Sequence, residues 1–122
     1  MSYGVAKMSI DDYRRSLMSS GNLTAEEINE LINFKYWAEP VSVDAQARYH
    51  FLLFKVEKPS LAEELWGEVK PLLKMVETAG KEIIERICRI FHRYAIEMEL
   101  CFKGLIYEVN DNGRIRLRAY ER

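Results

Sequence analysis

Hydrophobic residues recur at helical spacing through the first forty positions of the chain. Ser9 is a favourable N-cap for a helix over residues 10–19, and Gly21 is expected to end that helix. A capping box begins at Thr24, and apolar residues follow three and four positions apart as far as Pro40. The pattern predicts an N-terminal helical hairpin.

The next apolar stretch has no polar face. Residues 48–57 (RYHFLLFKVE) are rich in aromatic and branched side chains, a composition typical of a central strand. A buried helix that starts near Val43 is the alternative, because periodicity does not separate the two structures in so short a run. We favour the strand.

A broken pair of helices is predicted between residues 59 and 94. Pro59 opens the first helix with a second capping box, and Gly67 and Pro71 are expected to bend or break it within three turns. A boundary follows at residues 78–80. The second helix is indicated by apolar residues at three and four spacing, namely Ile83, Ile84, Ile87, Cys88, Phe91 and Tyr94.

From Ala95 the hydrophobic period changes to two, which indicates a strand, and a β-bulge at Gly104 keeps its apolar face continuous. A three-residue loop, Asp111 to Gly113, then separates apolar from polar faces, whereas a two-residue Asn-Gly turn mixes them. The predicted cross-strand partners are Val109 with Ile115, Tyr107 with Leu117, Leu105 with Ala119, Glu108 with Arg116, and Ile106 with Arg118.

Together these elements predict an α+β fold. Its parts are the helical hairpin, the internal strand, the broken helical pair and a C-terminal antiparallel β-hairpin, which give a three-stranded sheet covered by helices. A length of 122 residues corresponds to one domain over 1–122, with residues 1–8 expected to be flexible.

Composition and charge exclude several classes of protein. The chain is 48% hydrophobic, too apolar for a disordered segment, and its net charge of -1 gives no global attraction to nucleic acid. The longest purely apolar run, residues 51–54, is too short to span a bilayer, so a cytoplasmic protein without membrane contact is expected. A single glutamine, Gln46, beside fifteen Glu hints at a thermophilic source.

Two rows of arginines are the strongest candidate binding feature. The first lies on one face of the predicted last strand, with side chains about 7 Å apart, a spacing that suits a phosphate backbone. Protection of an exposed sheet edge is the alternative role for that row. The second row lies on the predicted helix that ends near Tyr94. Together the rows predict a small non-enzymatic protein that binds the backbone of DNA or RNA. The residues are Arg114, Arg116 and Arg118 in the first row, and Arg86, Arg89 and Arg93 in the second.

One pair of residues suggests an enzyme instead. Arg86 and His92 have an R-x5-H spacing that resembles the motif of the HEPN ribonuclease family. The resemblance is limited to these two residues. It implies cleavage of RNA by the Arg and the His, within a helical bundle that acts as a dimer.

Tyr36 and Trp37 are the candidate interaction residues, since they stand at a helix end before Pro40 and such aromatic side chains anchor interfaces well. They support the alternative hypothesis, a protein-interaction module or homodimer that does not bind nucleic acid.

No cofactor or metal is expected. A structural zinc site needs four clustered ligands, and the spacing of the two cysteines and two histidines does not match one. These residues are Cys88, Cys101, His50 and His92, and no disulfide is indicated. The remaining candidate site for a divalent ion is formed by Glu97 and Glu99, which lie on one face of the predicted strand, with His50 or His92 nearby. Ion pairs between these carboxylates and the arginines are the simpler interpretation. The usual hydrolase and nucleotide-binding signatures are absent from the sequence.

Overall fold

The computed structural model describes residues 8–98, 102–109 and 115–121, and within the two strands it describes the backbone. The predicted α+β fold with a three-stranded sheet is wrong, because the described chain is predominantly helical and its two strands pair only with each other. The elements are α1 (Ile10–Ser20), α2 (Ala25–Ile32), the π-helical turn η1 (Asn33–Trp37), α3 (Val43–Glu57), α4 (Pro59–Leu73), α5 (Val76–Ala79), α6 (Lys81–Met98), β1 (Phe102–Val109) and β2 (Ile115–Glu121).

The N-terminal helical hairpin is confirmed, and its caps are those that the sequence predicts. The Ser9 hydroxyl oxygen accepts a hydrogen bond from the backbone N–H of Asp12 at 3.1 Å. Thr24 and Glu27 exchange the two hydrogen bonds of a capping box at the start of α2. Gly21, with φ of 72°, ends α1 in the left-handed conformation that glycine adopts without steric cost.

The predicted internal strand is wrong. Residues 43–57 form helix α3, whose N-cap Ser42 accepts a hydrogen bond from the backbone N–H of Ala45 at 3.0 Å. The helix is apolar on more than one side because it packs against α2, α4 and β2 at once. Its burial therefore extends around the helix, which removes the polar face that usually identifies a surface helix.

The structure also contradicts the predicted second capping box, a break of the helix at Gly67 or Pro71, and the change to a strand at Ala95. Helix α4 has no side-chain cap at Lys58, so the second capping box is absent, and Pro59 instead occupies the first turn. The helix passes through both Gly67 and Pro71 and ends at Leu73. Helix α6 continues through the predicted change of period at Ala95 as far as Met98.

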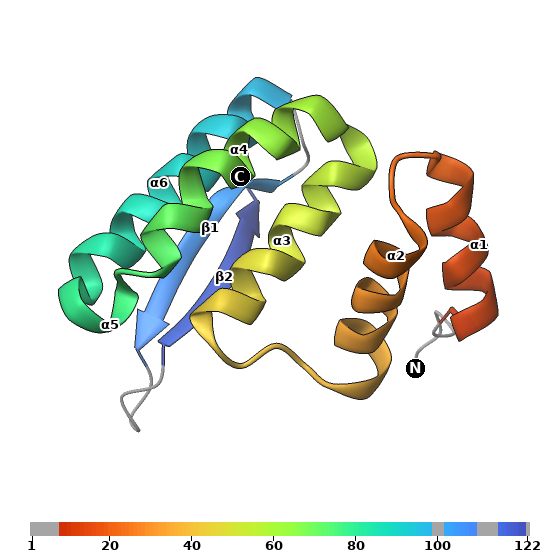
Figure 1. Cartoon of the computed structure of the whole chain (residues 1–122), viewed down its shortest axis with the longest axis horizontal. Coiled ribbons are helices and arrows are strands. Elements are labelled where there is room, and N and C mark those ends of the chain that lie inside the picture. Colours follow the sequence, from red (N-terminus) through yellow and green to blue (C-terminus); the bar gives the residue numbers. More distant parts are fainter. Residues whose placement is uncertain (1–7, 99–101, 110–114, 122) are drawn as a thin grey trace.

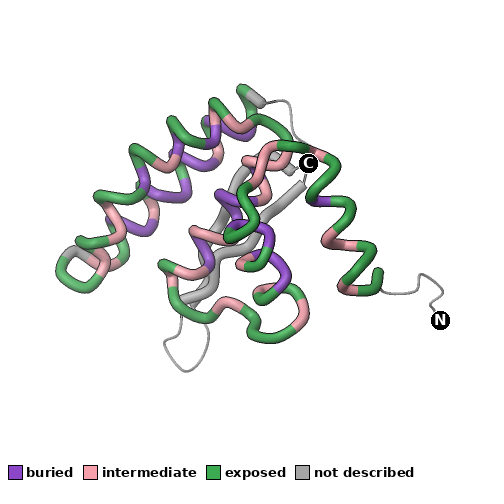
Figure 2. Tube along the Cα trace, turned by 45° about the vertical axis from the view of Figure 1, so that its right-hand side comes forward, coloured by how far each residue is buried: buried purple, intermediate pink, exposed green. Residues whose placement is uncertain are grey.

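A closed ring of elements surrounds the core. Helix α3 packs on α4, α4 on α6, α6 on β1, β1 on β2, and β2 returns to α3, while α1 and α2 lie outside α3 (Figure 1). Figure 2 shows buried residues on the facing sides of the helices and exposed residues on their outer sides. The largest fully buried side chains are Phe51, Phe54, Phe91, Leu31, Leu52, Leu65, Ile84, Ile87 and Val69.

The backbone pairing of β1 and β2 has the predicted register. Leu105 stands opposite Ala119, Val109 opposite Ile115, and the register shifts between Phe102 and Gly104, where the bulge was expected. The predicted loop Asp111 to Gly113 lies outside the described residues. Antiparallel pairing thus follows from the alternation of residues 105–109, even though the sheet has one strand fewer than predicted.

Charged side chains join α2, α3 and α4. Lys55 donates hydrogen bonds to Glu27 at 2.7 Å and to Glu63 at 2.8 Å. Burial alone would raise the pKa of Glu27, but the hydrogen bonds from Lys55 and Thr24 outweigh it and hold that pKa below its usual value. Arg48, in turn, donates to both carboxylate oxygens of Glu30, at 3.0 and 2.9 Å.

Candidate interaction surface

Trp37 is the most exposed large hydrophobic side chain in the part of the chain that the structure describes. Its relative exposure is 71%, and it ends η1, a π-helical turn that extends α2 by residues 33–37. The N–H of Ala38 donates to the carbonyl of Asn33 at 2.8 Å, five residues back, as a π-turn requires. Such turns are rare and occur frequently at functional sites.

The neighbouring Tyr36 holds this turn against α1. Its hydroxyl donates a hydrogen bond to the carbonyl of Met8, and its ring meets that of Tyr13 edge to face, with centroids 5.9 Å apart. The ammonium of Lys35 lies 4.6 Å from the centroid of Tyr13. Burial raises the pKa of Tyr13 to about 12, so its phenol stays uncharged near neutral pH. Tyr36 is therefore a packing residue, while Trp37 is presented to solvent.

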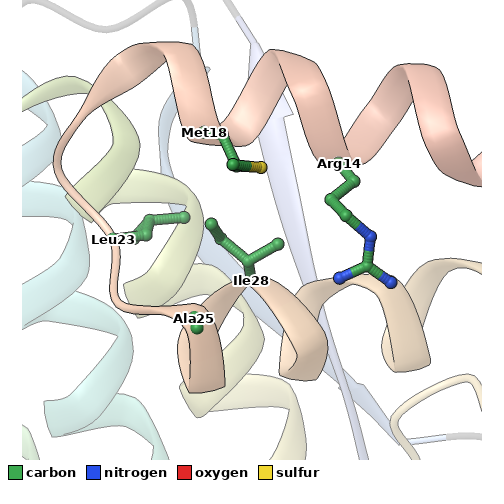
Figure 3. Close-up of a pocket in the computed structure, with 5 residues that line it drawn as sticks. All are labelled: Arg14, Met18, Leu23, Ala25 and Ile28. Atoms are coloured by element: carbon green, nitrogen blue, oxygen red, sulfur yellow. The ribbon is translucent and has the colours of Figure 1, made fainter.

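A shallow apolar groove lies between α1 and α2. Its volume is about 280 Å³, and Figure 3 shows the side chains of Met18, Leu23 and Ile28 converging on it from the two helices and their connection. Ala25 lines one end, and Arg14 stands at the rim. Met18 is 60% exposed, so the groove opens to solvent. This volume equals roughly nine waters at about 30 Å³ each, which suits one aromatic ring.

The rim of the groove is fixed by a hydrogen bond across the two helices. Nη1 of Arg14 donates to Oδ1 of Asn29 at 2.8 Å. This contact orients the planar guanidinium at the rim. None of the groove residues was predicted from sequence. The available signal was the turn at Gly21, which brings Met18 and Leu23 together.

The predicted arginine rows are only partly brought together. Arg86 and Arg89 are exposed on α6, and neither forms an ion pair with a described carboxylate. Arg93 differs, because its guanidinium donates to both carboxylate oxygens of Glu68 at 2.7 Å. The pKa of Glu68 is held below its usual value by the hydroxyl of Tyr94 and by Arg93.

The register places Arg116 opposite Glu108 and Arg118 opposite Ile106, two residues apart on β2. Arg114 lies outside the described residues, so the predicted strand row stays a prediction. Strand β1 packs beside α6, which brings the hairpin close to the helix that carries Arg86 and Arg89.

The R-x5-H pair does not converge within one chain. Arg86 and His92 lie on the same unbroken helix, α6, and six residues at about 100° each separate them by about 240° around the axis. Arg86 is exposed and His92 is half-buried. A joint action of the two on one RNA would require a second subunit.

The remaining titratable candidates do not form a metal site in the described part of the chain. No group of three or more His, Cys, Asp and Glu side chains clusters there. Glu97 stands on helix α6 rather than on a strand, and Glu99 lies outside the described residues. Burial raises the pKa of the Cys88 thiol to about 11, as expected of a packing residue.

His50 is the one described side chain with a buried polar atom that lacks a hydrogen-bond partner, its Nδ1. The side chain is 8% exposed and stands beside the ring of Tyr49, with centroids 5.4 Å apart. Burial lowers the pKa of His50 to about 4, so the imidazole is neutral at physiological pH. It does not line the groove between α1 and α2.

Comparisons of the chain with protein-family models, with curated proteins and with solved structures found no match. No helix in the described ranges is both long enough and apolar enough to cross a membrane.

Proposed function

We propose that this protein is a small protein-interaction module whose Trp37 inserts into an apolar pocket of a partner protein. The observation that carries the proposal is the 71% exposure of Trp37 beside a residue, Tyr36, that is tied to α1. The backbone at the indole is held in place by its neighbour, and the ring itself has little to pack on.

Binding energetics support this reading. Tryptophan is among the residues most enriched at the centres of interfaces, where its burial contributes more than that of most side chains. The hydrogen bond of Tyr36 to the Met8 carbonyl and its ring contact with Tyr13 order the π-turn before binding. This order reduces the conformational entropy lost on association. An exposed indole on an ordered backbone is the arrangement expected of an interface anchor.

Photo-crosslinking tests the proposal. A benzophenone amino acid replaces Trp37 in the full chain, and the matched control carries it at Lys70, an exposed position on α4. Irradiation in the native host should give discrete adducts from position 37 that are absent from position 70, and mass spectrometry identifies the crosslinked chains. Identical adducts at both positions, or none at position 37, contradict the proposal.

Phosphate-backbone binding is a second candidate, favoured by the exposure of Arg86 and Arg89 without a described carboxylate partner. Fluorescence anisotropy of labelled DNA and RNA over a salt series tests it. The Arg86→Ala, Arg89→Ala double variant should weaken binding and lower the salt slope by about two, because each lost phosphate contact releases about one counterion less. The double variant Lys70→Ala, Lys74→Ala is the control. An absence of binding at low salt excludes this candidate.

A further inference from the structure

Resting on the proposed function, we infer that the partner is a second copy of this chain. Trp37 of each subunit occupies the groove between α1 and α2 of the other, so that two identical contacts form about a two-fold axis. The groove is lined by Arg14, Met18, Leu23, Ala25 and Ile28 (Figure 3).

The chemistry of the groove fits an indole ring. Its floor is apolar, and its volume of about 280 Å³ is close to the smallest pockets that bind drug-sized ligands, which start at about 300 Å³. The thioether of Met18 provides a favourable contact with an aromatic edge. The guanidinium of Arg14, oriented by Asn29, stands at the rim, where it can lie over an indole face as a cation–π partner.

The groove and Trp37 share one face of the same helical element. Successive residues of α2 turn by about 100°, which places Ala25 and Asn29 roughly 40° apart on the outer side toward α1. A π-helical turn contains more residues than an α-helical turn, so each residue of η1 rotates by less than about 100° around the axis. With this smaller rotation, Trp37 lies on the same side of the helix as Ala25 and Asn29. The anchor and its receptor therefore lie at opposite ends of one face.

This placement makes the contact reciprocal. A two-fold axis across the middle of α2 carries the Trp37 end of one copy onto the Ala25 end of the other, and satisfies both contacts in a single closed dimer. Charge agrees with the arrangement, since the exposed carboxylate of Glu39 follows Trp37 closely and would approach the Arg14 guanidinium of the other copy.

Exposed apolar side chains concentrate in the N-terminal third of the chain, which contains both Trp37 and the groove. Six large hydrophobic residues are exposed in the described chain, and four of them lie between residues 8 and 41, namely Met8, Met18, Trp37 and Val41. Burial of two indoles, each against the Met18 of the other copy, gives an interface at the small end of the range for specific complexes. A reversible dimer with a Kd on the order of micromolar is therefore expected.

Sedimentation equilibrium of the purified full chain tests the inference. The wild type should shift from the 14.4 kDa monomer to twice that mass as concentration rises. Trp37→Ala removes the anchor, and Ala25→Glu puts a charged side chain in the groove at a first-turn position that tolerates an acid. Each variant alone should stay monomeric. Ser60→Glu, at an exposed first-turn position of α4, is the matched control and should dimerise normally.

A one-to-one mixture of the two variants gives the decisive result. The mixture retains one intact Trp37 and one intact groove, so it should form heterodimers that neither variant forms by itself. The inference is overturned if the wild type is monomeric at every concentration up to millimolar, or if a dimer persists unchanged in both variants.

Fluorescence gives an independent measurement that needs no loss-of-binding variant. In Trp66→Phe protein, Trp37 is the sole tryptophan, and its emission should move to longer wavelength as dilution exposes the indole. Emission that does not depend on concentration contradicts the dimer.

The two proposals can fail separately. If position 37 forms adducts with a different protein and the purified chain is monomeric, self-association is refuted and the interaction module remains supported. If adducts and dimers are both absent, the two proposals fail together.

Discussion

Lys55 and Glu27 form an ion pair in the interior between α3 and α2, with Nζ 2.7 Å from Oε2 and side-chain exposures of only 12% and 11%. The same ammonium contacts Glu63 on α4 at 2.8 Å. One lysine therefore links three helices, and it is the only described cation within ion-pair distance of the Glu27 carboxylate. Because Glu27 also caps α2 through Thr24, the pair connects local helix formation with tertiary packing.

Removal of the cation should be costly. Lys55→Ala removes the ion-pair partner of the Glu27 carboxylate and leaves it the hydrogen bond from the Thr24 backbone N–H, and loss of one partner of a largely buried charged hydrogen bond typically costs about 1–3 kcal/mol. Urea unfolding at neutral pH measures the change in the free energy of unfolding. Lys70→Ala, at an exposed position of α4, is the control and should cost less than about 0.5 kcal/mol. Equal effects of the two substitutions would show that the pair does not stabilise the fold.

The buried His50 predicts a loss of stability in acid. Unfolded His50 takes up a proton near pH 6.5, whereas burial lowers its pKa in the folded chain to about 4. Between these values the unfolded state binds more protons, so stability falls as pH drops through that window. The loss attributable to His50 should reach about 3 kcal/mol at pH 4.

The measurement for His50 is the difference in unfolding free energy between the wild type and His50→Leu, determined by urea titration from pH 7 to pH 4. Subtraction removes the contributions of carboxylates, such as Glu27, that both proteins share. The wild type should lose stability relative to the variant as pH falls. A difference that stays constant over the whole range would mean that His50 does not titrate differently in the folded state.

The buried Cys88 should be unreactive in the native protein. Its thiol is shielded in the core and its pKa is raised to about 11, chiefly by burial, so little thiolate is available near neutral pH. In a Cys101→Ser variant, where Cys88 is the sole thiol, a disulfide reagent should react only after unfolding. The rate in urea should greatly exceed the rate in buffer. Rapid reaction of the native variant would contradict this packing.

Much of the helical structure could be predicted because short-range chemistry determines it. Ser9, Thr24 and Gly21 act through neighbours at most a few residues away, and their roles are readable from sequence. The pairing of Leu105 with Ala119 follows from simple alternation between two adjacent segments. Such local signals do not depend on the rest of the fold.

The failures have a common cause, which is tertiary packing that hides the helical period. Residues 48–57 resemble a strand because α3 is covered by α2, α4 and β2 and therefore has apolar residues on several sides. The sequence shows no polar face that would identify a helix, and it does not show the neighbouring elements that explain why. In α6, the alternation around Ile96 suggested a strand, yet Ile96 stands exposed on a continuing helix. The sequence does not predict the groove between α1 and α2, because the groove forms only when the two helices pack against each other.

The two tryptophans should respond to substitution in opposite ways. Trp66 stacks on Phe51 with centroids 4.7 Å apart and lies 5.4 Å from the Arg48 guanidinium, so Trp66→Ala removes core contacts and should cost about 3 kcal/mol. Trp37→Ala removes an exposed ring and should change stability by less than about 0.5 kcal/mol. Urea unfolding followed by circular dichroism, at dilution sufficient to keep the chains monomeric, measures both. A loss at Trp37 as large as that at Trp66 would assign the exposed indole a structural role and remove the main support for an interface anchor.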